Sequence, residues 1–332
     1  MIIKYSVIMP CYNAANYIKN TLNRFQRITA GRNDIELIII NDGSNDSTLE
    51  LIKDISLPNL KIISTINKGV SNARNIGVKS AVGEFVMFLD SDDFYNSGIF
   101  DILDISLNDC DVLFFGYQTV TQDGGIKRKY SFGNLSNVGS NEGLNLLFKK
   151  ELPVHVCATV IRKCVLESTG VLFNINIHHC EDLEFIIKTI SSVNQISIIS
   201  NVLYNYVDNP NSAVNKVIDC KQLSKFDVFE SILPPILNAN KRLDNSYYNY
   251  YVLSVYLLLM IKVLTQGASS ELIVNSIYER FKVHISKEIH FPKDIVAFKI
   301  RTLTLLFRFI SFIQLHHLAN IFREFHVFKK SK

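Results

Sequence analysis

The sequence predicts an α/β fold with a mainly parallel sheet flanked by helices, followed by a mostly helical C-terminal region. Over the first 117 residues, short apolar runs of strand length alternate with segments whose apolar residues recur at helical spacing. The strand-like runs are apolar along their whole length, which is typical of strands covered on both faces. Strands that alternate with helices form βαβ units, and these build parallel sheets.

The individual elements follow from the same patterns. Helix starts are marked by N-cap residues, such as Asp46, Ser47 and Thr48, and Gly83 follows the end of one helical pattern. The predicted strands are 5–9, 35–40, 60–64, 84–89, 111–117 and, as one or two strands, 195–206. The predicted helices are 13–28, 49–55, 70–81, 97–107 and 181–193, and a largely helical stretch from about residue 220 to the end.

The length of 332 residues allows one large domain or two ordinary ones. We expect a first domain over residues 1–215, divided into halves at 117/118 where the regular alternation stops, and a helical region over 216–332. The apolar run 247–261 is shorter than the roughly 20 residues that a membrane-spanning helix needs, and polar residues interrupt it, which favours a buried helix.

The net charge of +4 argues against a nucleic-acid partner. The positive charge lies in residues 301–332, which hold six basic residues and one acid, so the rest of the chain is close to neutral. Six cysteines are scattered without a CxxC pair, and the chain opens without a signal peptide. These features favour free thiols and a cytoplasmic location.

Polar residues follow three of the predicted strands directly. They are Pro10-Cys11-Tyr12-Asn13, Asn41-Asp42-Gly43-Ser44 and Asp90-Ser91-Asp92-Asp93. The carboxyl ends of parallel strands meet at one edge of a sheet, where α/β proteins bind their ligands. We therefore expect the three segments to form one site.

Three carboxylates in four residues repel one another unless a cation shares them. Carboxylate oxygens suit Mg²⁺ or Mn²⁺, which proteins often hold through a few carboxylates and the phosphates of a substrate. The alternative is a solvated helix N-terminus, where Asp is also favoured. Residues His155 and Cys157 lack a spacing that indicates a zinc site.

The neighbouring segments offer groups for a nucleotide. Asp42 can accept a hydrogen bond from a base or a ribose, although an ordinary Asp-Gly turn gives the same pattern. Tyr12 offers an aromatic face for stacking. Lys68, Arg74 and Asn75 supply cationic and amide donors for a diphosphate.

Four segments, 6–13, 36–48, 67–77 and 83–93, resemble glycosyltransferase family 2, the large inverting family with the GT-A fold. The resemblance continues more weakly through 181–185 and 204–213. It implies a nucleotide-sugar-binding and catalytic domain over 1–215, with a donor half (1–117) and an acceptor half (118–215).

The resemblance also implies roles for individual residues. Tyr12 and Asp42 would hold the base, usually uracil, while Asp90 would lie near the ribose and Asp92 would bind Mn²⁺ or Mg²⁺, with Asp90 as the second choice for the metal. Asp93 would face the acceptor or cap the following helix. The full set of donor-binding residues is Pro10, Tyr12, Asn13, Asp42, Gly43, Ser44, Asn67, Lys68, Arg74, Asp90 and Ser91.

Asp182 matches the catalytic aspartate of the family and is the predicted general base, with Glu181 as the second choice. Simple negative charge at a helix N-terminus is the alternative, because the helix dipole favours it. Direct attack by an acceptor hydroxyl would invert the anomeric configuration.

The resemblance implies a UDP-sugar donor and a saccharide or lipid-linked saccharide acceptor, in bacterial surface polysaccharide synthesis such as capsule or O-antigen. The basic, apolar-rich stretch 301–332 either contacts the inner face of the cytoplasmic membrane or packs on the core, and both remain open. Two alternatives remain for the function. They are a silent nucleotide-sugar-binding subunit and a sugar-1-phosphate nucleotidyltransferase, which would need a glycine-rich loop where this chain has 10–15. Nothing in the sequence sets the oligomeric state.

Overall fold

The computed structural model describes residues 2–107, 110–133, 136–209, 223–238, 243–266 and 271–309. The chain divides into two compact units. The first comprises Met1–Leu144 with Pro153–Pro210, and the second comprises Asn145–Leu152 with Asn211–Lys332. The predicted boundary at 215/216 lies outside the described residues and stays a prediction.

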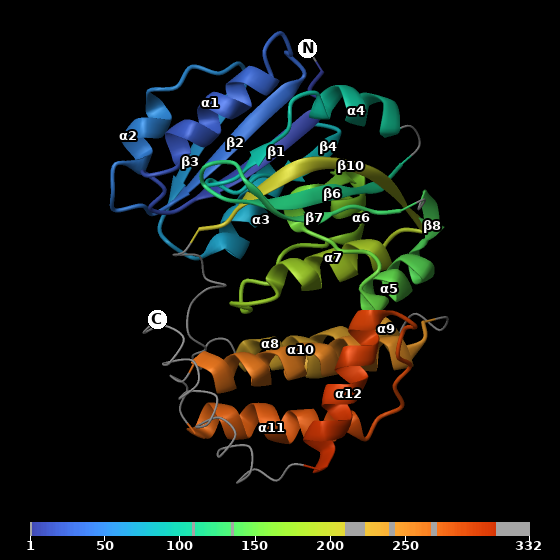
Figure 1. Cartoon of the computed structure of the whole chain (residues 1–332). Helices are drawn as coiled ribbons and strands as arrows, with labels where there is room; N and C mark the ends of the chain where they lie inside the picture. The colour runs from blue at the N-terminus through green and yellow to red at the C-terminus, as the bar shows by residue number, and fades with distance from the viewer. Residues whose placement is uncertain are drawn as a thin grey trace. The chain divides into compact units, whose positions relative to one another are not determined.

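The first unit is built on one mixed sheet of ten strands (Figure 1). Its main path runs β3-β2-β1-β4-β9-β6-β10-β5, while β7 pairs with β6 and β8 with β10. The strands are β1 (Tyr5–Cys11), β2 (Ile35–Asp42), β3 (Leu60–Thr65), β4 (Phe85–Phe88), β5 (Phe94–Tyr95), β6 (Val112–Val120), β7 (Ile126–Tyr130), β8 (Asn137–Gly139), β9 (Thr159–Arg162) and β10 (Gln195–Val207).

The parallel part of the sheet confirms the prediction for the donor half. Strands β3, β2, β1 and β4 are parallel neighbours, and β1 and β2 are buried along their whole length. Cys11 lies opposite Asn41, and Ile8 lies opposite Phe88. This register brings the segments after β1, β2 and β4 to the same edge, as the sequence predicted.

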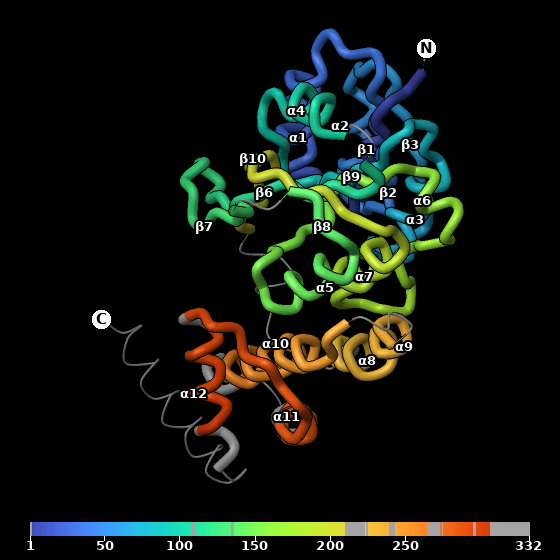
Figure 2. The backbone as a smooth tube through the Cα atoms, turned by 90° about the vertical axis from the view of Figure 1, so that its right-hand side faces the viewer, coloured from blue at the N-terminus to red at the C-terminus, as the bar shows by residue number. Residues whose placement is uncertain are grey.

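Helices cover both faces of this sheet (Figure 1). Figures 1 and 2 show α1, α2 and α4 on one face and α3 and α7 on the other. The helices of this unit are α1 (Ile18–Ile28), α2 (Thr48–Lys53), α3 (Val70–Ser80), α4 (Ile99–Ser106), α6 (Lys163–Thr169) and α7 (Glu181–Ser191), and α5 (Ser140–Lys149) continues into the second unit. The α/β fold with flanking helices is thus confirmed.

The second half of the sheet is less parallel than predicted. Strand β9 is antiparallel to both β4 and β6, and β5, β7 and β8 also pair in antiparallel fashion. Strand β10 is parallel to β6. Sequence periodicity missed β5 and β9 because they have two and four residues, too few to show a pattern.

Aromatic packing ties α7 to the sheet on the side that carries α3. The rings of Phe173 and Phe185 stack with their centroids 3.9 Å apart, and Phe88 of β4 meets both edge-on. All three side chains are buried. Such ring pairs add to the hydrophobic contribution of their burial and fix the position of α7.

The second unit is helical in its described part. Its helices are α8 (Ser224–Asp227), a π-helical turn (Val228–Ile232), α9 (Leu233–Asn238), α10 (Asn245–Gln266), α11 (Glu271–Ile285) and α12 (Ile295–Phe309). Helix α10 contains the apolar run 247–261, and its buried residues include Tyr250, Leu253 and Tyr256, as predicted for a core helix. Among the described residues no helix is long and apolar enough to cross a membrane.

The predicted membrane-contacting segment, 301–332, is described only as far as Phe309, where α12 ends. Residues 310–332 lie outside the described part of the chain. On α12, Phe298 and Leu305 are exposed together with Arg301. Membrane contact through this segment stays a prediction.

Gly77 on α3 offers a test of how tightly α3 packs on the sheet. A Cβ at this position would lie 2.2 Å from Cγ2 of Ile8 on β1. Gly77→Ala should lower the free energy of unfolding by about 1–2 kcal/mol, because the overpacking cost exceeds the gain in helix propensity. Urea titration of the full chain measures the change. Gly133→Ala is the control, since a Cβ there meets nothing within 4 Å, and an equal or greater loss in that control would contradict the packing argument.

Candidate functional site

The loops after β1 and β2 hold each other through side chain to backbone hydrogen bonds. The Asn13 side chain accepts from the backbone N–H of Asn45 at 2.8 Å, and the Ser44 hydroxyl accepts from the N–H of Asn13 at 3.1 Å. Asn13 has a positive φ of 49°, which Asn tolerates better than most residues. Two predicted donor-binding residues, Asn13 and Ser44, therefore also brace the loops at this edge.

Asp42 at the end of β2 fixes the turn after β3. Its buried carboxylate accepts from the backbone N–H of Lys68 at 2.9 Å and of Gly69 at 2.8 Å. Gly43 has a φ of 71°, and a Cβ there would lie 2.6 Å from the backbone nitrogen of Asn67, so the two loops touch. Asp42 thus positions the loop that carries Asn67 and Lys68, and its predicted contact with the base stays a prediction.

Arg74 on α3 connects the segment after β4 with the start of α7. Its Nη2 atom donates to Oδ1 of Asp90 at 2.9 Å, and its Nη1 atom lies 3.7 Å from Oε1 of Glu181. The guanidinium also lies over the ring of Phe173, 5.3 Å from its centroid. The side chain is buried, and within the described residues its Nε and Nη1 atoms have no hydrogen-bond partner. Two nitrogen atoms of one guanidinium are therefore available as hydrogen-bond donors inside the site.

The charges around Arg74 shift the two neighbouring carboxyl groups in opposite directions. Burial is the largest effect and acts to raise the pKa of Asp90, but the charges of Arg74 and His155, together with hydrogen bonds from Arg74 and Cys157, outweigh it and the pKa is lowered. Burial and the nearby charge of Asp182 raise the pKa of Glu181 to about 7, although Arg74 opposes the shift. Asp90 is therefore the ionised partner of Arg74, and Glu181 changes its charge near neutral pH.

Asp92 has no cationic partner among the described contacts. Its pKa is raised, first by burial and then by the charge of Asp90, while a hydrogen bond with Asn209 lowers it. Its side chain lines a hollow of about 220 Å³, together with Arg24, Phe94 and Gln122. Among the described residues no group of three or more His, Cys, Asp or Glu side chains is arranged to hold a metal ion. Mg²⁺ often takes only one or two carboxylates from a protein and completes its shell with substrate phosphates. Asp92, alone or with Asp90, meets that requirement.

Asp93 is a structural residue, and both roles expected for it were wrong. Its carboxylate is fully buried and accepts from the hydroxyl of Tyr204 and, at 2.7 Å, from the backbone N–H of Val207. Burial and the negative charges of Asp92 and Asp90 hold its pKa well above the usual range. It neither faces an acceptor space nor caps a helix, because β5 follows it and its oxygens hold β10.

The predicted general base lies at the start of α7. Asp182 accepts from the backbone N–H of Leu183 at 2.8 Å, and three acids lie in the first turn of the helix, where its dipole stabilises negative charge. The preceding residue, Cys180, has a positive φ of 65°, a conformation that costs energy for a side chain of this kind. This turn brings Glu181 next to Arg74.

His155 belongs to the site, although the sequence analysis considered it only as a zinc ligand. Its Nδ1 atom accepts from the backbone N–H of Cys157 at 3.2 Å, so the neutral ring carries its proton on Nε2. The ring lies among Tyr117, Tyr204 and Tyr206. Burial lowers the pKa of His155, and the charges of Asp90 and Asp182 oppose that shift. No periodic pattern marks this residue, because it precedes the short strand β9.

The remaining predicted residues lie at the same edge with fewer contacts. Tyr12 is 49% exposed, which leaves its ring open for stacking, and Pro10 is buried at the end of β1. Ser91 forms a hydrogen bond with the buried thiol of Cys11, and Asn67 and Lys68 are exposed. Arg74 thus contacts Asp90 and Glu181 directly. Tyr12 lies at the same edge of the sheet, but no described side-chain contact links it to these three residues.

The model of the family described as "Glycosyl transferase family 2" matches residues 6–170, about half of the chain, and this range holds the loops after β1, β2 and β4. The chain belongs to glycosyltransferase family 2. The start of α7, with Glu181 and Asp182, lies beyond the matched range. Its assignment to the site depends on the contact of Glu181 with Arg74.

Similar curated proteins include named glycosyltransferases. The chain is 28% identical to the uncharacterized glycosyltransferase EpsJ of Bacillus subtilis over 222 residues, 64% of this chain and 63% of that protein. It is 26% identical to the poly(ribitol-phosphate) beta-N-acetylglucosaminyltransferase TarS of Staphylococcus aureus, over 71% of this chain and 41% of that protein. The chain therefore spans less than two thirds of the length of these relatives.

The fold has a solved counterpart. The structure of residues 1–349 of S. aureus TarS in complex with UDP-GlcNAc superposes with a TM-score of 0.69 and 19% identity, over 98% of this chain and 92% of that one. The same fragment in complex with UDP gives a TM-score of 0.64 at 21% identity. At this level of identity the likeness concerns the fold, and it confirms the predicted GT-A architecture.

The ion pair of Arg74 with Asp90 can be tested by its pH dependence. Arg74→Met should lower the free energy of unfolding by about 3–5 kcal/mol at pH 7, because it leaves a buried carboxylate without its cation. The deficit relative to the wild type should shrink between pH 7 and pH 5, since an unpaired buried Asp90 has a raised pKa and takes up a proton as the pH falls. Urea unfolding at both pH values measures this.

The double variant Arg74→Met/Asp90→Asn is the matched control for that experiment. It removes both charges and should regain most of the lost free energy of unfolding at pH 7. A double variant no more stable than Arg74→Met would show that the loss comes from packing against Phe173 and not from the unpaired charge.

Proposed function

We propose that the chain is an inverting glycosyltransferase that moves a sugar from a UDP-sugar to a hydroxyl of a saccharide or lipid-linked saccharide. The contact of Arg74 with both Asp90 and Glu181 carries the proposal. It places the start of α7, with the proposed base Asp182, beside the edge of the sheet where the donor residues lie. A donor site and a base are thereby brought together by one buried cation.

The buried donors of Arg74 support a negatively charged ligand. Its Nε and Nη1 atoms lack hydrogen-bond partners among the described residues, and such atoms are costly to bury unless a ligand satisfies them. Lys68, on the loop held by Asp42, adds a second cation at the same edge. A nucleoside diphosphate supplies the oxygens that both cations require, and Tyr12 offers its exposed ring to the base.

In the proposed reaction the acceptor hydroxyl attacks the anomeric carbon from the face opposite the diphosphate. The new C–O bond forms as the bond between the anomeric carbon and the diphosphate oxygen breaks, and the hydroxyl proton passes to the carboxylate of Asp182. The products are the β-linked glycoside of an α-linked donor, and UDP. Arg74 stabilises the charge of the leaving diphosphate. Glu181, with its pKa of about 7, gains or loses a proton next to the base near neutral pH.

A divalent cation, Mn²⁺ or Mg²⁺, is part of the proposal. Asp92 would hold it, and Asp90 is the second choice because it already shares its charge with Arg74. Burial and then the charge of Asp90 raise the pKa of Asp92, and no protein cation among the described contacts compensates its negative charge, which is the condition that a metal ion relieves. When bound, the ion supplies Lewis-acid stabilisation of the leaving diphosphate.

The acceptor class is proposed from the relatives. TarS acts on poly(ribitol-phosphate) as a beta-N-acetylglucosaminyltransferase, and another relative, GgaB of B. subtilis, is a minor teichoic acid biosynthesis protein that is 29% identical over 61% of this chain. They support a role in bacterial surface polysaccharide synthesis, and UDP-GlcNAc is the first donor to test. A capsule or O-antigen acceptor remains part of the proposal.

The proposed base is tested by Asp182→Asn. The substitution should lower kcat by about 10²–10⁴-fold, the usual contribution of a general base, and leave the Kd for UDP-sugar within a few-fold. Transfer from radiolabelled UDP-sugars to a membrane lipid extract gives the rate, and calorimetry gives the Kd. Asp54→Asn, which changes an exposed acid directly after α2, is the control and should leave both unchanged. Activity of Asp182→Asn above a tenth of the wild type would exclude Asp182 as the base.

The metal ligand is tested through binding of UDP, independently of transfer. In the wild type, Mn²⁺ should strengthen UDP binding at least about tenfold, and Asp92→Asn should remove that gain, because one charge-assisted ligand is lost. Thermal shift with UDP, with and without Mn²⁺ and after EDTA, measures it. A gain from Mn²⁺ that survives in Asp92→Asn would assign the ion to another residue.

A further inference from the structure

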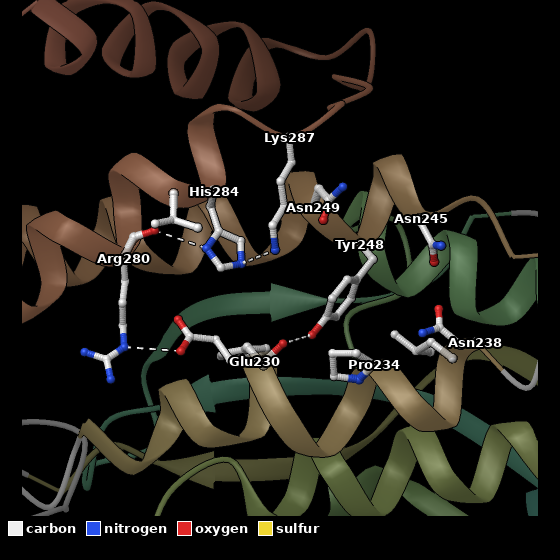
Figure 3. A pocket seen from close by; sticks show the side chains of 12 residues that line it. Glu230, Pro234, Asn238, Asn245, Tyr248, Asn249, Arg280, His284 and Lys287 are labelled. Carbon is white, nitrogen blue, oxygen red and sulfur yellow. Dashed lines mark hydrogen bonds and ion pairs between the residues drawn. The ribbon is translucent and has the colours of Figure 1, made fainter.

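The helical unit contains a hollow of about 490 Å³ of its own (Figure 3). Its walls come from the π-helical turn Val228–Ile232 and α9 on one side and from α10 and α11 on the other. This volume exceeds that of one sugar ring. The hollow involves none of the residues assigned to sugar transfer.

One end of the hollow is a polar network around the partly exposed side chains of Glu230 and Arg280. Glu230 accepts from Nε of Arg280 at 3.3 Å and from the hydroxyl of Tyr256 at 2.9 Å. The Arg280 charge is therefore neutralised in place. Glu230 lies in a π-helical turn, an irregularity that is rare in helices and recurs at functional sites.

Lys287 supplies a positive charge that the network does not neutralise. Its ammonium group donates to Nε2 of His284 at 3.2 Å, and Nδ1 of His284 in turn donates to the backbone oxygen of Arg280 at 3.1 Å. The His284 side chain is 2% exposed, and burial and the charge of Lys287 lower its pKa, so the ring is neutral. His284 thus holds the ammonium group at the hollow without cancelling its charge (Figure 3).

Amide side chains lie at the other end. Asn238 of α9 and Asn245 of α10 line it opposite Arg280, and Asn249 is oriented by donating to the backbone oxygen of Glu288 at 2.9 Å (Figure 3). The ring of Tyr248 and the side chain of Pro234 form apolar surface between the two ends. Amides beside apolar ring surface suit the hydroxyls and the C–H faces of a sugar, and the fixed ammonium group suits a negative charge on it.

We propose that this hollow binds a saccharide unit that carries a phosphate or a carboxylate, with Lys287 as its counter-charge and Asn238 and Asn245 as partners of its hydroxyls. It is a second saccharide site, separate from the residues proposed for transfer. The proposal rests on the proposed function in one respect: such a unit would belong to the acceptor or product chain. It deepens that function by giving the chain an anionic substrate class.

Direct binding without donor tests the proposal on the full chain. The probes are N-acetylglucosamine 6-phosphate, digalacturonate, neutral maltose and inorganic phosphate, titrated by saturation-transfer NMR. The two anionic sugars should bind about tenfold more tightly than maltose, the gain expected for one charge-assisted hydrogen bond. Lys287→Gln should remove that gain for both, and the two probes separate a phosphate preference from a carboxylate preference. Asn245→Ala should weaken all three sugars several-fold.

Lys293→Gln is the matched control, because this exposed lysine of the same unit lies outside the hollow and should leave every affinity unchanged. Unchanged binding by Lys287→Gln would overturn the proposal, and so would a loss confined to Lys293→Gln. Inorganic phosphate that binds as tightly as the sugar phosphate would also overturn it, since it would reveal an anion site without sugar recognition. UDP binding by the same variants reports the donor site separately, so a failure of the proposed function is recognised by itself.

Discussion

The buried guanidinium of Arg74 is the interaction on which the site depends. It pairs with Asp90 after β4, lies 3.7 Å from Glu181 at the start of α7, and packs over Phe173. A charge buried in this way is stable only where its partners compensate its desolvation, so the three elements must meet. The left-handed turn at Cys180 is tolerated within that arrangement. Local strain at the start of α7 is thus offset by tertiary contacts.

The same arrangement divides one acidic cluster into three different groups. Asp90 is ionised by its cation, Asp93 is buried against Tyr204 and the backbone of Val207, and Asp92 has no protein cation among the described contacts. Burial, and after it the repulsion among the three, raises the pKa of both Asp92 and Asp93. Asp93 also lacks a cation but is tied to β10 by its hydrogen bonds, which leaves Asp92 as the proposed metal ligand. The partners of each carboxylate, more than its place in the motif, set its chemistry.

The parts of this picture that the sequence predicted are those with local signals. Apolar strands of five or more residues, and the loops that follow β1, β2 and β4, were found because periodicity and parallel topology are sufficient to place them. Strand β9 and His155 were missed, because four residues carry no period and a single histidine has no spacing. Asp93 was misassigned since its partners, on β10, are more than a hundred residues away. The ion pair of Arg74 with Glu181 likewise joins residues that only the folded chain brings together.

Each unit contains an ion pair beside a charged group that has no oppositely charged partner among the described contacts. In the first, Arg74 neutralises Asp90 and leaves Asp92 as the uncompensated anion; in the second, Glu230 neutralises Arg280 and leaves Lys287 as the uncompensated cation. The opposite charges of an ion pair largely cancel, so the pair contributes little to the electrostatic potential of the site. The remaining charged group therefore sets the sign of that potential. These remaining charges support the two proposals: a cation that carries a diphosphate at the first site, and an anion on a saccharide at the second.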